Sequence, residues 1–525
     1  MARWWAAFIV ITIALVIPLL LSAVPPLLDY PNHLARMYIL VHDQQDTALS
    51  RMYQVKWHIV PNIGIDLTLP LLAKILSLED SGKVFIALSI LLPFFGTVRL
   101  HHVIFKQYSY WPLSVALVAY NRLLFTGFLN FLIGIGLALL AASVWEKNRE
   151  KPLIVRLLSA VIFAILIFFC HLIAVGFYGL LLLCLEFGRM RKLKSLNPIA
   201  LLIVFLPFLI PFLFYLASSF AQEPSNSFII HTGTAGGWQR YYLAFMAERS
   251  LKVIGLAGAF LTYNRVLDFA ALFTISLTTG ICLFMRWGKM SFGLAGAFSV
   301  LMVAYPFVPF GLMDTAWIDQ RLPIMAAFLI FAGFLPEIPF RKAGILIAVA
   351  VIAVFIAREA EVVGIWRSHD IDVRDFRSLI TVVSEGERVL VVRPEPDAKA
   401  STRGVDSVAE MLNNDATTHL PAFLVIDRKA FWPLLFTAAG KQPLQVVPPY
   451  AELAMPEGNP PRVHELATPE APPPPWAPYL HEWPQHFDWV IVLRPSAVPD
   501  APHLLPEQLD LIRIGRVAAL YKVRK

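Results

Sequence analysis

Long apolar runs recur along the first two thirds of the chain, and they constrain its fold more than any other feature. Segments such as 127–145, 154–170 and 198–219 carry no charged residue over nearly their whole length. The hydrocarbon core of a bilayer is about 30 Å thick, so an apolar helix of about 20 residues crosses it. A mean hydropathy of +0.63 and a charged fraction of only 15% agree with this interpretation. The sequence predicts a polytopic α-helical membrane protein.

The predicted number of transmembrane helices is about 11. The expected spans are 4–24, 84–98, 110–121, 127–145, 154–170, 173–187, 198–219, 266–285, 291–311, 322–338 and 343–357. The first could be a signal peptide, but it is long, contains Pro18 and lacks a small-residue cleavage site, which favours a retained helix. A further apolar stretch, 251–263, would reverse all later loops if it crossed, so it is interpreted as interfacial or re-entrant.

Lysine and arginine in the short loops predict the orientation of the spans. Basic clusters occur at 99–106, 146–151, 188–194, 286–289 and 340–342. With the N-terminus in the cytoplasm, each cluster falls on the cytoplasmic side, as the positive-inside rule requires. Two long outer loops, 25–83 and 220–265, follow from this topology. The predicted location is the cell (inner) membrane, with the C-terminal region extracytoplasmic or periplasmic.

The chain changes character after the last span, so it is divided into a membrane module, 1–357, and a soluble domain, 358–525. Apolar stretches at 386–394, 422–427, 487–495 and 511–523 look like short strands. They predict a small α/β domain, with the proline-dense segment 455–484 as an extended surface loop.

Charge and cysteine usage exclude several classes of protein. The net charge of +7 comes mostly from basic clusters between apolar runs, which fits anionic lipid better than nucleic acid. Cys170, Cys184 and Cys282 all lie within apolar runs and have no metal-ligand spacing. No P-loop motif is present, which argues against coupling to a nucleotide.

The first outer loop is too organised for a simple connector. It begins "DYPNHLARMYIL", in which Asp29 precedes a segment with helical spacing and Pro31 favours a helix start. It continues "KWHIVPNIGIDLTLPLLAKIL" (56–76), an extended W-x-x-x-P-x-x-G piece before another apolar helix. Ionisable groups are thus placed directly where the chain leaves the bilayer.

At these residues the sequence resembles the GT-C superfamily of membrane glycosyltransferases, nearest to the branch of protein O-mannosyltransferases and lipid A aminoarabinose transferases. Asp29 matches the family's catalytic acid, "NHLARMYIL" its surface helix, and "WHIVPNIGIDLTLPLL" the segment that follows. Many members carry two successive acids here, whereas Tyr30 and Pro31 follow Asp29 in this chain. Whether a divalent metal ion takes part is therefore left open, and no other cofactor is expected.

The resemblance implies transfer of a sugar from a polyprenyl-phosphate donor to an acceptor on the outer face of the membrane. The acceptor could be an envelope glycan, a lipid or a protein. Such a reaction needs a base for the acceptor hydroxyl, for which Asp29 is the candidate, and cations for the leaving phosphate. The predicted donor-binding residues, which supply a positive charge or a hydrogen-bond donor near the outer rim, are His33, Arg36, Arg122, His171 and Arg321.

Structural alternatives exist for several of these residues. Arg321 could form an ion pair with Asp319, Arg122 could extend to the membrane surface, and His171 could be a satisfied interior histidine. Asp66, Trp238, Arg240, Tyr241 and Asp319 are further candidates for sugar or acceptor contacts. Asp66 could instead cap a helix, and the glycine-rich segment holding the aromatic residues could be a surface turn.

Two other classes of protein remain open. A transporter or lipid flippase should place ionisable residues deep within its spans, whereas here they concentrate at one rim. A non-catalytic assembly or receptor protein predicts no organised polar cavity at that rim. The glycosyltransferase interpretation predicts that Asp29, Arg122, His171 and Arg321 converge there on one outward-opening cavity with a side gap to the bilayer.

Overall fold

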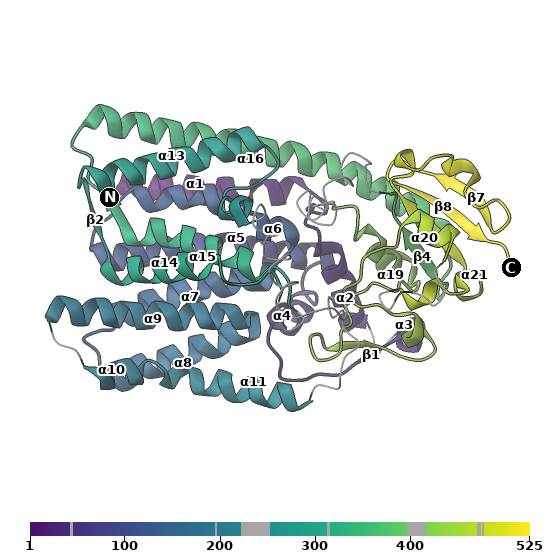
Figure 1. Ribbon diagram of the computed structural model, residues 1–525, viewed down its shortest axis with the longest axis horizontal. Coiled ribbons are helices and arrows are strands. Elements are labelled where there is room, and N and C mark those ends of the chain that lie inside the picture. Colours follow the sequence, from purple (N-terminus) through teal and green to yellow (C-terminus); the bar gives the residue numbers. More distant parts are fainter. Residues whose placement is uncertain are drawn as a thin grey trace.

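The computed structural model consists of a long helical bundle with a mixed α/β domain at one end (Figure 1). It describes residues 1–525 except 43–45, 195–196, 222–251, 312–314, 396–415, 470–473 and 475–476. We call the end that contacts the domain the domain end of the bundle, and the opposite end, where the N-terminus lies, the far end. The predicted class, a polytopic helical membrane protein with a C-terminal α/β domain, is confirmed.

Eight helices in the described part of the chain are long and apolar enough to cross a membrane. They are α1 (Ala2–Leu21), α5 (Leu78–Phe105), α7 (Leu129–Lys147), α8 (Leu153–Cys170), α9 (Leu172–Leu193), the segment Pro198–Ser218, α13 (Arg265–Phe284) and α16 (Arg341–Leu379). The segment Pro198–Ser218 contains α10 (Pro198–Ile203) and most of α11 (Leu209–Ala221). Two shorter helices, α14 (Phe292–Ala304) and α15 (Ile318–Gly333), correspond to two more predicted spans. The number of eleven crossings therefore stays a prediction.

The centre of the bundle is the crossing of α5 and α7, where glycine allows the two backbones to touch. A Cβ added at Gly136 of α7 would lie 2.5 Å from the Leu92 carbonyl carbon of α5. A Cβ added at Gly96 of α5 would lie 2.8 Å from the Gly136 carbonyl oxygen. Small residues at helix crossings are the usual means of close packing between membrane helices.

The predicted span 110–121 is a 3-10 helix, η1 (Trp111–Val118), followed by the short helix α6 (Arg122–Thr126). It runs along α1: Trp4 Nε1 donates to Ser109 O at 2.8 Å, Tyr120 Oη to Leu15 O at 2.8 Å, and Leu28 N to Phe125 O at 2.8 Å. A 3-10 helix rises about 2.0 Å per residue, against 1.5 Å in an α-helix, so fewer residues cover the same distance.

The five basic clusters of the sequence gather at the far end (Figure 1). There Trp4 packs on Tyr108 at 4.9 Å and Trp287 packs on Phe340 at 5.5 Å. Strands β2 (Gly288–Met290) and β3 (Phe334–Pro336) pair there as well. The alternation of helix directions expected from the charge pattern is thus present in the fold.

The first outer loop forms α2 (Tyr30–His42), α3 (Thr47–Met52), β1 (Tyr53–Val55) and α4 (Gly64–Leu72) at the domain end. The residues 252–263 also lie at this end and do not cross the bundle, since the Gly258 carbonyl accepts from Arg122 N at 3.1 Å. The interpretation of 251–263 as re-entrant or interfacial is consistent with this position.

The C-terminal domain is built on a four-stranded sheet of order β4-β6-β8-β7. The strands are β4 (Val389–Val392), β6 (Trp489–Leu493), β7 (Leu509–Ile514) and β8 (Ala518–Val523), and β4 and β6 are parallel while the other pairs are antiparallel. Around the sheet lie η4 (Leu420–Ala422), α19 (Phe423–Arg428), β5 (Leu444–Val446), α20 (Val463–Ala467) and α21 (Trp483–His486). Helix α16 runs without a break from the bundle into this domain (Figure 1).

Two expectations for this domain differ from the structure. The predicted strand at 422–427 is helix α19, because a short apolar run does not distinguish a buried strand from a buried helix. The proline-dense segment 455–484 contains α20, and its last part buries Tyr479, Leu480 and Trp483 in the domain core. It is more than the extended surface loop that its composition indicates.

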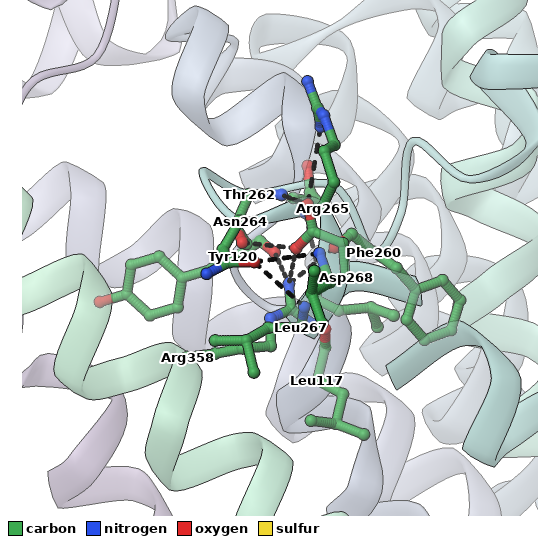
Figure 2. Close-up of polar contacts among 12 residues, drawn as sticks. Leu117, Tyr120, Phe260, Thr262, Asn264, Arg265, Leu267, Asp268 and Arg358 are labelled. Atoms are coloured by element: carbon green, nitrogen blue, oxygen red, sulfur yellow. Dashed lines mark hydrogen bonds and ion pairs between the residues drawn. The ribbon is translucent and has the colours of Figure 1, made fainter. Parts of the chain in front are cut away.

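A buried arginine of α16 stabilises the end of the 3-10 crossing (Figure 2). Arg358 Nη1 donates to Leu117 O at 2.7 Å, and Nη2 donates to Phe260 O at 2.8 Å and Tyr120 O at 3.4 Å. Its charge faces Asp268 at 3.7 Å, whose carboxylate also accepts from Thr262. One side chain thereby satisfies carbonyl groups of two irregular segments that regular helices would have paired internally.

Arg358→Met should destabilise the protein by about 3 kcal/mol or more, because the buried carbonyls lose their donor and the Asp268 carboxylate loses one of its partners. Arg367→Met, on an exposed position of the same helix, is the matched control and should have little effect. Thermal unfolding in detergent measures both. Equal midpoints for the two variants would contradict the structural role of Arg358.

Candidate active site

Four of the predicted site residues, Asp29, Arg122, His171 and Arg321, belong to or contact residues 121–131, which link the end of the 3-10 crossing to α7. Asn121 caps α6 by accepting from Leu123 N at 3.1 Å and Leu124 N at 3.2 Å. Gly127 ends α6 with φ of +101°, a conformation that favours glycine. We call the residues 121–131 the rim turn, since they lie at the domain end of the bundle.

Asp29 lies directly against the rim turn. Its backbone N–H donates to Thr126 O at 3.0 Å, and a Cβ added at Gly127 would lie 2.8 Å from the Asp29 Cβ. The Asp29 side chain is 15% exposed and its Oδ1 lies 3.4 Å from His419 Nδ1. Burial raises the pKa of the Asp29 carboxyl, and the neighbouring His419 opposes this shift. A partly buried carboxyl with a raised pKa is well suited to accept a proton.

Arg36 and Asp66 form a buried ion pair beside this acid. Arg36 Nε donates to Asp66 Oδ1 at 2.6 Å and Nη2 donates to Oδ2 at 3.1 Å, with side chains 2% and 0% exposed. Arg36 Nη2 also donates to His33 Nδ1 at 3.3 Å, and burial together with the arginine charge lowers the pKa of His33. The charge of Arg36 is thus already balanced within the first outer loop, where the pair joins α2 to α4.

Arg321 and His171 lie on the α7 side of the rim turn. The guanidinium of Arg321 is 4.9 Å from the ring centre of Phe128 and 5.1 Å from that of Phe131. Its Nη1 lies 2.5 Å from His171 Nε2, and His171 packs its ring edge on Phe131 at 5.4 Å. Arg321 forms no ion pair with any residue that the structure describes, which differs from the alternative of an Arg321–Asp319 bridge.

The contacts of His171 leave an excess of hydrogen-bond donors. Its Nδ1 accepts from Ile173 N at 3.1 Å as the cap of α9, while the guanidinium of Arg321 faces its Nε2. A neutral imidazole has a single lone pair, so it accepts from one of these two groups and not from both. An anion between Arg321 and Nε2–H would accept from both groups and remove the conflict.

Arg122 begins α6 on the rim turn and is buried, with 5% of its surface exposed. Its guanidinium stacks on the ring of Trp317 at 4.5 Å, and its Nε has no hydrogen-bond partner among the described residues. The side chain is therefore not extended to the membrane surface, the alternative open from the sequence. Phe128 contacts the same Trp317 ring at 6.5 Å, so Arg122 and Arg321 flank one aromatic pair.

Asp319 belongs to a neighbouring polar group. Its Oδ2 lies 3.8 Å from Lys252 Nζ and accepts from Gln320 Nε2 at 3.1 Å. Lys252 also donates to Val308 O at 2.6 Å. The carboxylate is thus balanced by Lys252, at the start of the segment 252–263, rather than by Arg321.

Three predicted contact residues, Trp238, Arg240 and Tyr241, lie outside the described residues. Within the described ranges, no group of three or more His, Cys, Asp and Glu side chains is placed to hold a metal ion.

Sequence reasoning missed His419, Lys252 and Asn130. Asn130 accepts from Ile65 N at 3.2 Å and donates to Asn62 O at 2.8 Å, which fixes the "PNIG" segment to α7. Gly64 permits this close approach, since a Cβ there would lie 3.3 Å from Asn130 Oδ1. Asn130 and Lys252 were visible as polar residues beside apolar runs, whereas His419 lies in the C-terminal domain, with no local signal linking it to Asp29.

The fold and the site together define a class: a polytopic helical membrane protein with a polar site at one rim, covered by a soluble domain. No protein-family model matches the chain, and no curated protein sequence matches it. The structure is similar to the crystal structure of ArnT from Cupriavidus metallidurans in the apo state, with a TM-score of 0.49 and 11% sequence identity. The similarity covers 99% of this chain and 97% of that one.

Arg36→Met should lower the free energy of unfolding by about 3–5 kcal/mol, because it leaves the Asp66 carboxylate buried without a partner. The double variant Arg36→Met with Asp66→Leu should recover most of this loss, since no charge then stays buried. The matched control is Arg524→Met with Asp510→Leu, an exposed pair whose removal should change little. A lower midpoint of thermal unfolding for the double variant than for Arg36→Met would contradict this explanation of the ion pair.

Proposed function

We propose that the protein is a glycosyltransferase of GT-C type that transfers a sugar from a polyprenyl-phosphate donor to an acceptor hydroxyl. One observation carries the proposal: a carboxyl group and a guanidinium with no acidic partner among the described residues contact adjacent residues of a single turn at the rim of a membrane bundle. Asp29 contacts Gly127, and Arg321 stacks on Phe128. The resemblance of residues 29–72 to the GT-C superfamily supports the same assignment.

In the proposed reaction the acceptor oxygen forms a bond to the anomeric carbon of the sugar while the bond from that carbon to the phosphate oxygen breaks. Asp29 takes the proton of the acceptor hydroxyl as general base. The electron pair of the broken bond leaves with the polyprenyl phosphate. Negative charge that develops on the phosphate is stabilised by the donors that face it.

Arg321 and His171 are the residues that we assign to the donor phosphate. Arg321 supplies a guanidinium that has no acidic partner among the described residues. His171 supplies an imidazole that faces two hydrogen-bond donors, Ile173 N–H and Arg321, although it can accept from only one of them. Arg122, buried against the ring of Trp317, adds a second positive charge to the same rim. These groups are already dehydrated, so their interaction with a phosphate is stronger than it would be in water.

The proposed orientation places the domain end outside the cytoplasm and the far end inside, in the cell (inner) membrane. The basic clusters at the far end support this orientation through the positive-inside rule. The donor lipid would then lie in the outer half of the bilayer, with its phosphate at the level of the rim turn. Envelope glycans, lipids and proteins are all acceptors compatible with this side.

Asp29→Asn should lower transfer by about 10²–10⁴-fold with little change in thermal stability, because the amide cannot take the acceptor proton. Transfer is measured with radiolabelled polyprenyl-phosphate sugars and the purified protein in lipid. Asp80→Asn, the same change at a 60% exposed position near the first outer loop, is the matched control. Unchanged turnover in Asp29→Asn would remove Asp29 from the mechanism.

The pH dependence of kcat/KM should show an acid limb above the ordinary carboxyl pKa of about 3.9. Burial raises the pKa of Asp29, so the base is protonated and inactive at pH values at which an exposed carboxyl would be ionised. The rate should therefore rise with pH as Asp29 loses its proton. A rate that stays constant down to the ordinary carboxyl range would contradict the assignment of Asp29 as general base.

A further inference from the structure

His419 joins the soluble domain to the candidate base. It precedes η4, and its side chain is 8% exposed. Its Nδ1 lies 3.4 Å from Asp29 Oδ1 and has no hydrogen-bond partner among the described residues. A buried polar atom without a hydrogen-bond partner lowers the free energy of unfolding, so the position of His419 Nδ1 opposite a carboxyl group calls for an explanation.

The surroundings hold the His419 ring in place. Phe436 stands between two histidines and contacts the ring of His419 at 5.5 Å and that of His33 at 5.4 Å, both edge to face. Trp432 also contacts His419, with 6.1 Å between the ring centres. The ring is thus enclosed by aromatic side chains of its own domain while Nδ1 faces the membrane module.

The segment that carries these aromatic residues is fixed to α2 by one amide side chain. Asn32 Nδ2 donates to Leu434 O at 3.1 Å, and Asn32 Oδ1 accepts from Phe436 N at 2.7 Å. Strand β1 of the first outer loop also pairs with β5 of the domain. Asn32 lies one helical turn from Asp29, so the docking of the domain and the position of His419 are coupled.

The hydrogen-bonding capacity of the two groups defines how they interact. An ionised carboxylate only accepts hydrogen bonds, so Nδ1 must carry its proton to interact favourably with Asp29. Other titratable and charged groups that act on this pair are His33 and Arg36 of α2 and Glu457 of the domain. Arg36 is bound to Asp66, and among the described residues His419 is the one basic side chain within 4.0 Å of the Asp29 carboxylate.

We propose that His419 is a positioning residue for Asp29. His419 directs its Nδ1–H at the Asp29 carboxylate, orients this carboxylate towards the acceptor and favours the ionised form of Asp29. This inference rests on the proposed function of Asp29 as general base. It gives the C-terminal domain a direct part in the site, because the base is complete only when the domain is docked. Removal of His419 should therefore move the acid limb of kcat/KM to higher pH, since Asp29 loses the neighbour that opposes the effect of burial.

The test uses the full-length protein in lipid and three variants of His419. His419→Leu removes the donor, His419→Asn keeps an N–H donor near the position of Nδ1, and His419→Gln places it farther out. The control is His503→Leu, a histidine of the same domain whose Nδ1 lies 2.8 Å from Asp500 Oδ1 but which is 76% exposed. Misplacing a base by about 1 Å costs on the order of 100-fold in rate.

We expect His419→Leu to lower kcat by about 10- to 100-fold with KM for the lipid donor unchanged, and to move the acid limb upward. His419→Asn should restore much of the rate, His419→Gln should not, and His503→Leu should match the wild type. If His419→Leu fails to fold, the Asn and Gln variants carry the same comparison. Wild-type rate and pH profile in the folded His419 variants would overturn the proposal.

Infrared difference spectroscopy provides a readout that does not depend on turnover. The carboxyl band lost in Asp29→Asn identifies Asp29, and its titration should occur at higher pH in His419→Leu than in the wild type. If the Asp29 band titrates at the same pH in His419→Leu and in the wild type, the role of His419 is overturned, whether or not sugar transfer can be assayed. If the titration shifts but no polyprenyl-phosphate sugar is turned over, the positioning contact stands and the proposed function fails.

Discussion

The site depends on two backbone hydrogen bonds between segments about 100 residues apart in the chain. Leu28 N donates to Phe125 O at 2.8 Å and Asp29 N donates to Thr126 O at 3.0 Å. They join the exit of α1 to the rim turn, so the first carboxyl group outside the bundle lies beside the residues that Arg321 and His171 contact. Without this junction Asp29 would belong to a surface loop, and the cations would face an unrelated part of the rim.

Other interactions hold this junction in place. Asp370 of α16 accepts from Ser22 Oγ at 3.1 Å, from Ala23 N at 3.0 Å and from Val24 N at 3.1 Å, where α1 ends. Arg358, three turns earlier on the same helix, donates to the Leu117 and Tyr120 carbonyl groups that precede the rim turn. Helix α16 thus fixes both partners of the junction and then continues into the domain that carries His419. Rigid support of this kind is what a positioned catalytic group requires.

The membrane class, the order of most apolar helices and several residues of the candidate site could be predicted because each leaves a local signal. Apolar runs mark spans, and Asp29, Arg122, His171 and Arg321 stand out as ionisable groups at the ends of such runs. Pairing between distant segments left no such signal. Neither the Arg36–Asp66 ion pair nor the Lys252–Asp319 pair follows from spacing, and His419 lies 390 residues after Asp29. The helix α19 was mistaken for a strand because six apolar-rich residues fit both periods.

A structure of Asp29→Asn in lipid with a bound polyprenyl-phosphate sugar tests the central claim most directly. A phosphate oxygen is expected to accept from Arg321 and from His171 Nε2–H, with the anomeric carbon between that phosphate and residue 29. The short contact between Arg321 and His171 should open to admit the anion. A phosphate bound elsewhere on the bundle, with Arg321 and His171 still in contact, would contradict the account.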